Sequence, residues 1–178
     1  MGGKLTGEKR VPWSTAYKTA EKIHEVMEKY DIRHLFCGSY RRTTLDIGDL
    51  DMIVVGALSP IVNTVQLDPL FRETLQSLQS AKMKTAQWIV DGMQLDMYGV
   101  AEESFGSMAL FLTGSQKFNI IVRGEAKRQG YKLNQYGLWQ GDERIAGKSE
   151  EQIFDALGLK YVRPIDRSVE SFKRLERA

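Results

Sequence analysis

Residues 48–55 place two acidic side chains at the start of an otherwise apolar run. Successive side chains of a strand point to opposite faces, so Asp49 and Asp51 share one face and Leu50 takes the other. Their Cα atoms then lie roughly 6.5 Å apart, which lets both carboxylates reach one ion. Converging like charges need a cation or a proton, and oxygen ligands favour Mg²⁺ or Mn²⁺. Two acids at a surface strand start are the alternative, and their context favours the metal site.

The segments around this strand predict a small α+β layer. Helical spacing predicts a helix over 14–30 with Ser14 as N-cap, and an apolar run predicts a short strand at 34–37. Residues 56–67 are expected to form a loop. Asp68 and Pro69 then start a helix, with an apolar face of Leu70, Phe71, Leu75 and Leu78. Asp91-Gly92 between two apolar runs predicts a two-residue hairpin.

The second half predicts a smaller α+β unit. Helices are expected over 105–112 and 115–129, the latter capped by Ser115, and short strands over 131–134 and 138–139. Ser149 and Gln152 fit the capping box of a further helix that ends at Gly158. The charged tail from residue 166 to 178 is expected to fray.

The charge distribution and the cysteine content indicate which kind of partner and which compartment to expect. Residues 1–105 carry 12 Lys/Arg and 14 Asp/Glu, and residues 106–178 carry 13 and 9, so the second half holds the basic excess. That excess favours a polyanionic partner. Cys37 is the only cysteine, in an apolar run typical of a buried, inert thiol. No apolar run could span a membrane, and a cytoplasmic, intracellular protein is expected.

A possible phosphate-binding turn precedes the acidic strand. Gly38 permits close approach of backbone N–H groups, Ser39 adds a hydroxyl, and Arg41 and Arg42 add charge. An ordinary solvated turn explains these residues equally well. However, a Gly-Ser turn some ten residues before Gly-Asp-x-Asp resembles the nucleotidyltransferase superfamily. In that fold a third carboxylate comes from a neighbouring strand.

Asp96 is the expected third carboxylate, since it lies in the apolar stretch 93–98. Asp91 competes for this role, but the hairpin turn explains it. Three tryptophans are assigned to packing. His24 and His34 show no metal-ligand spacing, and no chemistry is expected of them.

A narrower resemblance, covering about residues 8–168, is to the family X DNA polymerases such as DNA polymerase beta. The motifs that carry it are Glu8-Lys9-Arg10-Val11-Pro12, Gly38-Ser39-Tyr40-Arg41-Arg42, Gly48-Asp49-Leu50-Asp51, Phe111-Leu112-Thr113-Gly114-Ser115 with Phe118-Asn119 and Arg123, Tyr131-Lys132-Leu133-Asn134-Gln135-Tyr136-Gly137-Leu138, and the C-terminal segments Ile153-Phe154-Asp155, Lys160 to Pro164 and Asp166-Arg167-Ser168. The chain departs from the family at Phe111-Leu112, where Tyr-Phe is common, and at Gln94, where a basic residue is common.

The resemblance implies a nucleotidyltransferase-fold palm with a mixed β-sheet and flanking helices over 1–104. A small α+β subdomain over 105–178, fingers or thumb by nomenclature, would follow it. Asp49, Asp51 and Asp96 would be catalytic and would hold two Mg²⁺ ions, with Mn²⁺ as a substitute. The residues implied to bind the nucleotide are Arg10, Gly38, Ser39, Arg42, Gly48, Phe111, Leu112, Gly114 and Asn119. The residues implied to bind template DNA are Arg123, Lys127, Lys132 and Tyr136.

The implied function is template-directed addition of dNMP from a dNTP to the primer of a primer–template or gapped DNA, in repair. The protein is expected to be a monomer that binds no membrane. A template-independent nucleotidyltransferase and an inactive DNA-binding module are the alternatives. The chain begins at the palm and resembles the short polymerases of some viruses, with a viral or mobile-element origin open. It is expected to have no 5′-deoxyribose-phosphate lyase activity.

Overall fold

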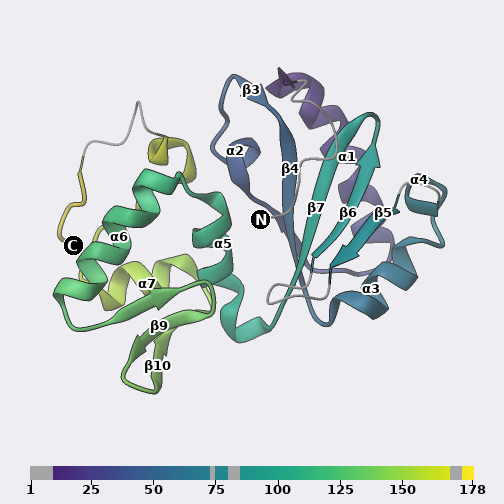
Figure 1. The fold of residues 1–178 in the computed structure, drawn as a ribbon. Helices are drawn as coiled ribbons and strands as arrows, with labels where there is room; N and C mark the ends of the chain where they lie inside the picture. Colours follow the sequence, from purple (N-terminus) through teal and green to yellow (C-terminus); the bar gives the residue numbers. More distant parts are fainter. Residues whose placement is uncertain (1–9, 73–74, 80–84, 169–173) are drawn as a thin grey trace.

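The protein was analysed as a computed structural model, which describes residues 10–72, 75–79, 85–168 and 174–178. It has an N-terminal subdomain built on a β-sheet and a C-terminal subdomain of helices and a small sheet (Figure 1). The short helix α2 (Gly38–Arg41) and the helix α5 (Phe105–Thr113) lie between them in this view. This arrangement agrees with the predicted α+β class. None of the described helices is long and apolar enough to cross a membrane.

The central sheet is mixed and brings two distant acidic segments together. Its order is β2 (His34–Phe36), β4 (Asp49–Val55), β7 (Met93–Val100), β6 (Thr85–Val90) and β5 (Leu75–Gln79). Strands β4 and β7 are parallel, whereas the other pairs are antiparallel. A parallel pair needs a long crossover connection, which here includes the β5–β6 segment.

Helix α1 (Trp13–Lys29) covers one face of this sheet. Its buried residues recur at helical spacing and pack with the apolar face of β4: Ala16, Ala20, Ile23 and Met27 meet Leu50, Met52 and Val54. The predicted N-cap is wrong by two residues, because the helix begins at Trp13 after Pro12 and no side chain caps it. This apolar packing leaves the acidic face of β4 on the other side of the sheet.

Two predictions between β4 and β6 are wrong. The expected loop contains helix α3 (Leu58–Val65), with Pro60 in its first turn, where a missing N–H group breaks no intrahelical bond. Helix α4 (Pro69–Arg72) starts as predicted, with Asp68 accepting from the Leu70 backbone N–H at 3.1 Å, but it ends early. The chain from Leu75 instead forms β5. Its pairing with β6 shifts register near Ser77, which disturbs the strand period that the sequence would otherwise show.

The hairpin between β6 and β7 is confirmed. Asp91 has φ 50° and Gly92 has φ 77°, the positive values that a tight two-residue turn requires. Asp91 also forms an exposed ion pair with Lys22 at 2.7 Å. The turn and this pair account for Asp91 without a catalytic role.

The C-terminal subdomain has its own core. Helices α6 (Gln116–Arg128) and α7 (Glu150–Ala156) pack with a sheet of order β10 (Glu143–Ala146), β9 (Gly137–Gln140) and β8 (Lys132–Asn134). The predicted caps are confirmed: Ser115 accepts from the Phe118 N–H and Ser149 from the Gln152 N–H. The short polar strand β10 was not predicted.

The predicted fraying of the tail is wrong for the part that the structure describes. Residues Pro164–Arg167 form a 3₁₀ turn in which Arg167 is fully buried. At the end of the chain, the Lys160 N–H donates to Glu176 O at 2.8 Å and the Ala178 N–H donates to Gly158 O at 3.1 Å. Residues 169–173 lie outside the described part of the chain.

The two subdomains meet through an apolar cluster and a buried ion network. Cys37 and Ile53 pack with Met108 and Ala109 of α5. Cys37 is fully buried, and burial raises the pKa of its thiol to about 12, as expected of an inert cysteine. Beside it, Glu150 of α7 accepts from Arg41 of α2 at 2.6 Å, which ties the subdomains together.

Candidate active site

Strands β4 and β7 hold the three acidic residues on one face of the sheet. Asp49 and Asp51 are two residues apart on β4, and Asp51 lies directly opposite Asp96 on β7. Opposite residues of neighbouring strands point to the same face, so all three carboxylates share it. Ile53, next on this face, packs towards α5. Because the apolar residues of β4 must pack against α1, the acidic residues of this strand point to the opposite face of the sheet.

The carboxylates repel one another in a poorly hydrated place. Burial, followed by the charges of Asp49 and Asp96, raises the pKa of Asp51 to about 7, although Arg42 and the Tyr98 hydroxyl oppose the rise. Burial also raises the pKa of Asp96, and the nearby Asp49 adds to the effect. Acids whose pKa values are raised by burial and by one another's charge favour a bound cation.

The donor set fits a divalent cation with a preference for oxygen ligands. Three carboxylates, one of them also bonded by a phenol, are the hard ligands that Mg²⁺ and Mn²⁺ prefer. Among the described residues, the side chains whose ligand atoms already lie within 4.8 Å of one another form a different group. The three carboxylates therefore suit such an ion by their chemistry.

Gly38 is required by the way α2 approaches this site. A Cβ atom there would lie 2.4 Å from Asp51 Oδ2, and the residue has φ +60°. The neighbouring Cys37 N–H donates to the Asp51 backbone carbonyl at 2.7 Å. The predicted glycine thus allows close packing of α2 against the carboxylate, and the predicted turn at 38–42 contains a short helix.

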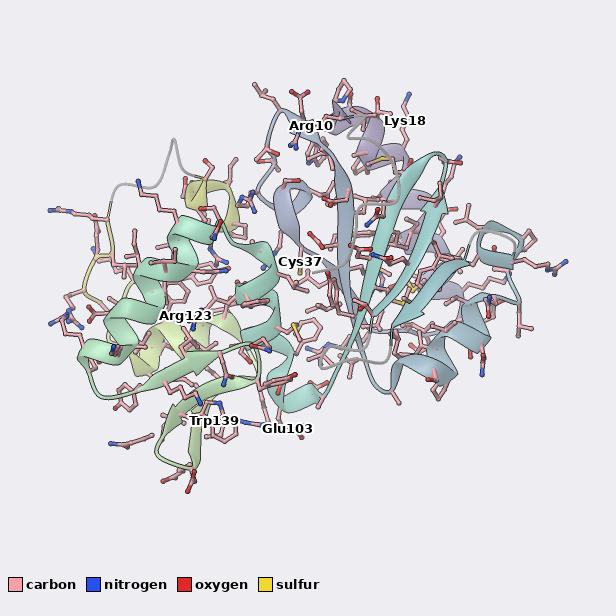
Figure 2. All side chains as sticks on the ribbon, viewed as in Figure 1. Arg10, Lys18, Cys37, Glu103, Arg123 and Trp139 are labelled. Atoms are coloured by element: carbon pink, nitrogen blue, oxygen red, sulfur yellow. The ribbon has the colours of Figure 1, made fainter. Side chains whose placement is uncertain are left out.

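A cleft of about 540 Å³ opens beside the acids and between the subdomains. Asp49 and Asp51 contribute to its wall from the sheet, and the predicted nucleotide-binding residues in its wall are Gly38, Ser39, Arg42, Phe111, Leu112, Gly114 and Asn119. Arg123 also lines it from α6, and Figure 2 shows this side chain on the C-terminal subdomain. The structure thus brings most of the predicted nucleotide-binding set to one cleft.

Arg10 lines a second pocket that continues from the first, and Gly48 lies beside Arg10. The volume of this pocket is about 650 Å³, and it shares Ser39, Arg42 and Ser115 with the cleft. The Arg10 guanidinium donates to Asp46 O at 2.7 Å, and a Cβ on Gly48 would lie 3.5 Å from it. Figure 2 shows Arg10 at the upper edge of the N-terminal subdomain. The guanidinium groups of Arg10 and Arg42 therefore extend the positive charge of the site into the second pocket.

The Phe111–Asn119 segment is held by its own hydrogen bonds. The Asn119 side-chain amide donates to Phe111 O at 2.7 Å, which joins α6 to the end of α5. The Arg42 guanidinium donates to the Thr113 carbonyl across the subdomain boundary. Arg42 therefore faces the cleft and also contacts the segment that forms its opposite wall.

Arg41 has a different role from the one expected for it. Its guanidinium donates to Thr113 Oγ1 at 2.9 Å and to Glu150 at 2.6 Å, and it lines neither pocket. Arg167 binds the same carboxylate at 2.5 Å. The prediction that Arg41 supplies charge to a phosphate is corrected: it joins the two subdomains.

The remaining predicted DNA-binding residues are exposed but lie outside both pockets. Lys127 follows Arg123 by about one turn of α6, and Lys132 begins β8. Tyr136 is 41% exposed in the turn between β8 and β9. The structure does not bring these three into the cleft, and their role in binding a template stays a prediction.

Sequence reasoning noted Gln94 only as a departure from the family, and it did not predict the side chains that support the acids. Gln94 donates to both oxygens of Asp96, at 3.0 and 3.1 Å, and Gln87, opposite Asp96 on β6, also bonds it. Tyr98 bonds Asp51. The period of two on β7 was an available signal, because Gln94 and Tyr98 flank Asp96 at that spacing and must share its face.

Comparison with known proteins agrees with this geometry. Residues 10–112 match the DNA polymerase beta palm and residues 108–168 the DNA polymerase beta thumb. The chain is 32% identical over 81 residues to DNA polymerase IV of Saccharomyces cerevisiae. The aligned segment covers 46% of this chain but only 14% of the yeast protein. It is 25% identical to Repair DNA polymerase X of African swine fever virus, covering 73% of this chain and 78% of the viral one.

The fold comparison points the same way. Polymerase beta of Leishmania infantum, solved as a ternary P/T complex, superimposes with a TM-score of 0.70 at 23% identity, covering 90% of this chain and 77% of that one. That likeness reports the fold, whereas the palm match alone extends over more than half of the chain. The chain therefore belongs to the family X DNA polymerases, with a palm and a thumb of the DNA polymerase beta type.

Proposed function

We propose that the chain is a template-directed DNA polymerase that adds deoxynucleotides to a primer 3′-hydroxyl in DNA repair or gap filling. The observation that carries this proposal is the placement of three acids on one face of β4 and β7, beside a cleft whose far wall comes from the thumb. A relative is named a repair polymerase, and a solved neighbour is a polymerase beta in a ternary P/T complex. Those names describe the relatives, and they support the same substrate class here.

Divalent metal ions are the cofactors of polymerases in this family. In this chain Asp49 and Asp51 would hold two ions, with Asp96 sharing one of them, and Mg²⁺ is the proposed ion with Mn²⁺ as a substitute. Such ions supply a lower pKa for the primer hydroxyl and neutralise charge on the triphosphate. Strand β7 places no basic side chain beside these carboxylates. Instead, the neutral amides of Gln94 and Gln87 bond Asp96.

The proposed nucleotide site follows the walls of the cleft. Ser39 and Arg42 would bind the triphosphate, with Arg10 and Gly48 extending the site along the second pocket. The thumb residues Phe111, Leu112, Gly114 and Asn119 would contact the sugar and base of the incoming nucleotide. Positioning of this kind, with charge stabilisation, supplies most of the rate in phosphoryl transfer.

The proposed DNA contacts lie on the thumb. Arg123 lines the cleft, and Lys127, Lys132 and Tyr136 are exposed beyond it, which suits contacts to a template backbone. The palm is proposed to comprise residues 1–104 and the thumb residues 105–178, acting as a monomer. A template-independent transferase is the second candidate, because the cleft does not itself show what pairs with the incoming base.

A primer-extension assay tests the proposal. A labelled primer with and without template is given single dNTPs or rNTPs and Mg²⁺, and templated addition of the complementary dNTP alone is expected. Equal addition of all four dNTPs without template would favour the second candidate. The matched control pair is Asp49→Asn, which should be inactive, and Asp91→Asn, a carboxylate in the exposed hairpin turn of the same sheet, which should be active.

A further inference from the structure

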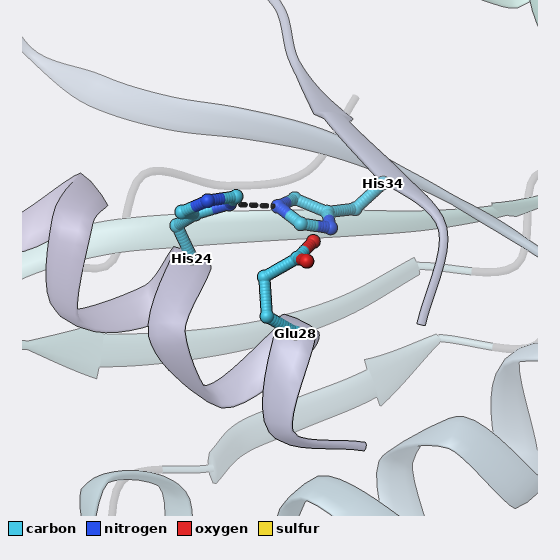
Figure 3. Close-up of side chains that lie close together, drawn as sticks. All are labelled: His24, Glu28 and His34. Carbon is cyan, nitrogen blue, oxygen red and sulfur yellow. Dashed lines mark hydrogen bonds between the residues drawn. The ribbon is translucent and has the colours of Figure 1, made fainter. Parts of the chain in front are cut away.

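A second group of possible metal ligands lies on the palm, away from the carboxylates. His24 and Glu28 project from α1, and His34 comes from the start of β2 (Figure 3). One ligand atom from each side chain lies within 4.8 Å of the others. His24 and Glu28 are four residues apart, so they share one face of the helix. The fold brings them to His34, which sequence spacing did not reveal.

This group lies on the opposite face of the sheet from the acids. His34 pairs with Val54 of β4, and Val54 belongs to the apolar face that packs with α1. Asp51, an odd number of residues before Val54, points to the other face. Because β2 is the edge of the sheet, the group is open to solvent and independent of the cleft.

The hydrogen bond between His34 and the Ile32 carbonyl leaves the other ring nitrogen, Nε2, able to bind a metal ion. The His34 Nδ1 atom lies 2.8 Å from Ile32 O, and a carbonyl can only accept, so Nδ1 carries the hydrogen. Neutral His34 therefore has its free lone pair on Nε2, the nitrogen that faces His24 Nδ1. A backbone carbonyl bonded to the far nitrogen of an imidazole is the usual support of a metal-binding histidine, since it fixes the ring and its tautomer.

The distance between the two rings suits one bridging cation. His24 Nδ1 lies 2.9 Å from His34 Nε2. Two nitrogens bound to one tetrahedral zinc, each at about 2.0–2.1 Å, are separated by about 3.3 Å, so the pair needs to open by only a few tenths of an ångström. The His24 side chain is exposed and free to make this movement, after its proton shifts to Nε2 or leaves.

We propose that His24, Glu28 and His34 form a site for a transition-metal cation of the zinc class, separate from the catalytic ions. Two imidazoles and one carboxylate are ligands that Zn²⁺ accepts, whereas Mg²⁺ prefers oxygen ligands alone. Water completes the coordination because the group is solvent-exposed. The bound ion joins the last turns of α1 to the edge strand, and so stabilises the palm.

The test uses the full chain without a polyhistidine tag, stripped with a chelator and then held in excess Mg²⁺. Calorimetric titration with Zn²⁺ is expected to show one equivalent bound, with a rise in melting temperature. The variants His24→Ala and Glu28→Gln are expected to weaken binding by at least about tenfold, as the loss of even an outer-shell partner does. Titration with Co²⁺ should give the visible absorption of a nitrogen-liganded ion.

Two controls separate this site from scattered surface carboxylates and from the catalytic acids. Glu25→Gln, an exposed carboxylate on the same helix, and Asp51→Asn, in the active site, should both bind Zn²⁺ as the unmodified protein does. Circular dichroism of each variant in chelator checks that it folds. Zn²⁺ binding that survives His24→Ala and Glu28→Gln, or that disappears in Asp51→Asn, would overturn the proposal, as would no binding at all.

Discussion

The palm and the thumb bury acidic groups in opposite ways. In the palm, burial and neighbouring acids raise the pKa of Asp51 to about 7. In the thumb, burial alone would raise the pKa of Glu150, but Arg167 and Arg41 outweigh it and hold that pKa below its usual range. A buried acid with two guanidinium partners serves the structure, whereas one crowded by other acids is suited to bind a cation. The charges of the neighbouring side chains therefore distinguish a structural acid from a candidate metal ligand better than the extent of burial does.

Asp51→Asn, Asp49→Asn and Asp96→Asn test the palm side, where the largest effect is expected. Each should lower the rate of nucleotide addition by about a thousandfold or more, because charge that holds the metal ions is removed. Without metal the melting temperature of Asp51→Asn should stay the same or rise, since a mutual repulsion is relieved. Single-turnover primer extension and thermal melts in chelator measure both. A melting temperature well below that of the unmodified protein would contradict the comparison.

Glu150→Gln tests the thumb side. The free energy of unfolding should fall by about 3–4 kcal/mol, because Arg167, which is fully buried, loses its only buried carboxylate partner among the described residues. Urea unfolding measures the change. Glu151→Gln, exposed in the same helical turn, is the matched control and should stay within about 0.5 kcal/mol. Equal effects of the two substitutions would show that the network contributes little.

Arg42→Ala and Arg41→Ala compare, at neighbouring positions, the cleft beside the acids with the buried ion network of Glu150. Arg42 lines the cleft, so its loss should raise the KM for dNTP by about ten- to a hundredfold, the value of roughly 1.5–3 kcal/mol for a charged hydrogen bond. Arg41→Ala should instead lower stability, because it leaves Glu150 with one guanidinium fewer. Steady-state kinetics and melts on both variants give the answer. The reverse pattern would exchange the roles proposed for these arginines.

Tyr98→Phe is expected to have the smallest effect. The hydroxyl favours ionised Asp51, so its removal should raise the pKa of Asp51 further, by about 0.7 unit for a hydrogen bond worth roughly 1 kcal/mol. The raised pKa means that folded protein binds more protons than unfolded protein between about pH 4 and 7. Metal-free stability from Asp51 is therefore present at low pH and lost as pH rises to about 7. In Tyr98→Phe the midpoint of that loss, followed by melts against pH, should move upwards.

The local features of this chain were predictable, and those that depend on long-range pairing were less so. The Asp91-Gly92 hairpin and the Ser115 and Ser149 caps follow from chemistry within a few residues. Helix α3 was missed because proline in a first helical turn resembles a loop signal.

The grouping of Asp49, Asp51 and Asp96 was predictable only through the resemblance, since nothing within residues 49–96 fixes the register of β4 on β7. The roles of Arg41 and Arg42 could not be separated, because Glu150 lies more than a hundred positions away. The burial of Arg167 was also missed, because a charged tail read on its own does not suggest that its arginine binds Glu150, 17 positions earlier.

The parallel pairing of β4 with β7 also sets an order of events during folding. The β6–β7 hairpin closes through two residues and is a microsecond event, whereas β4 must find β7 across the whole of α3, α4, β5 and β6. Contacts between distant segments form later, because the chain must first lose loop entropy. We therefore expect Asp96 to be in place on its strand before Asp51 reaches it. The acids repel only once the pairing forms, so in refolding without metal the electrostatic cost of the site arises at a late step.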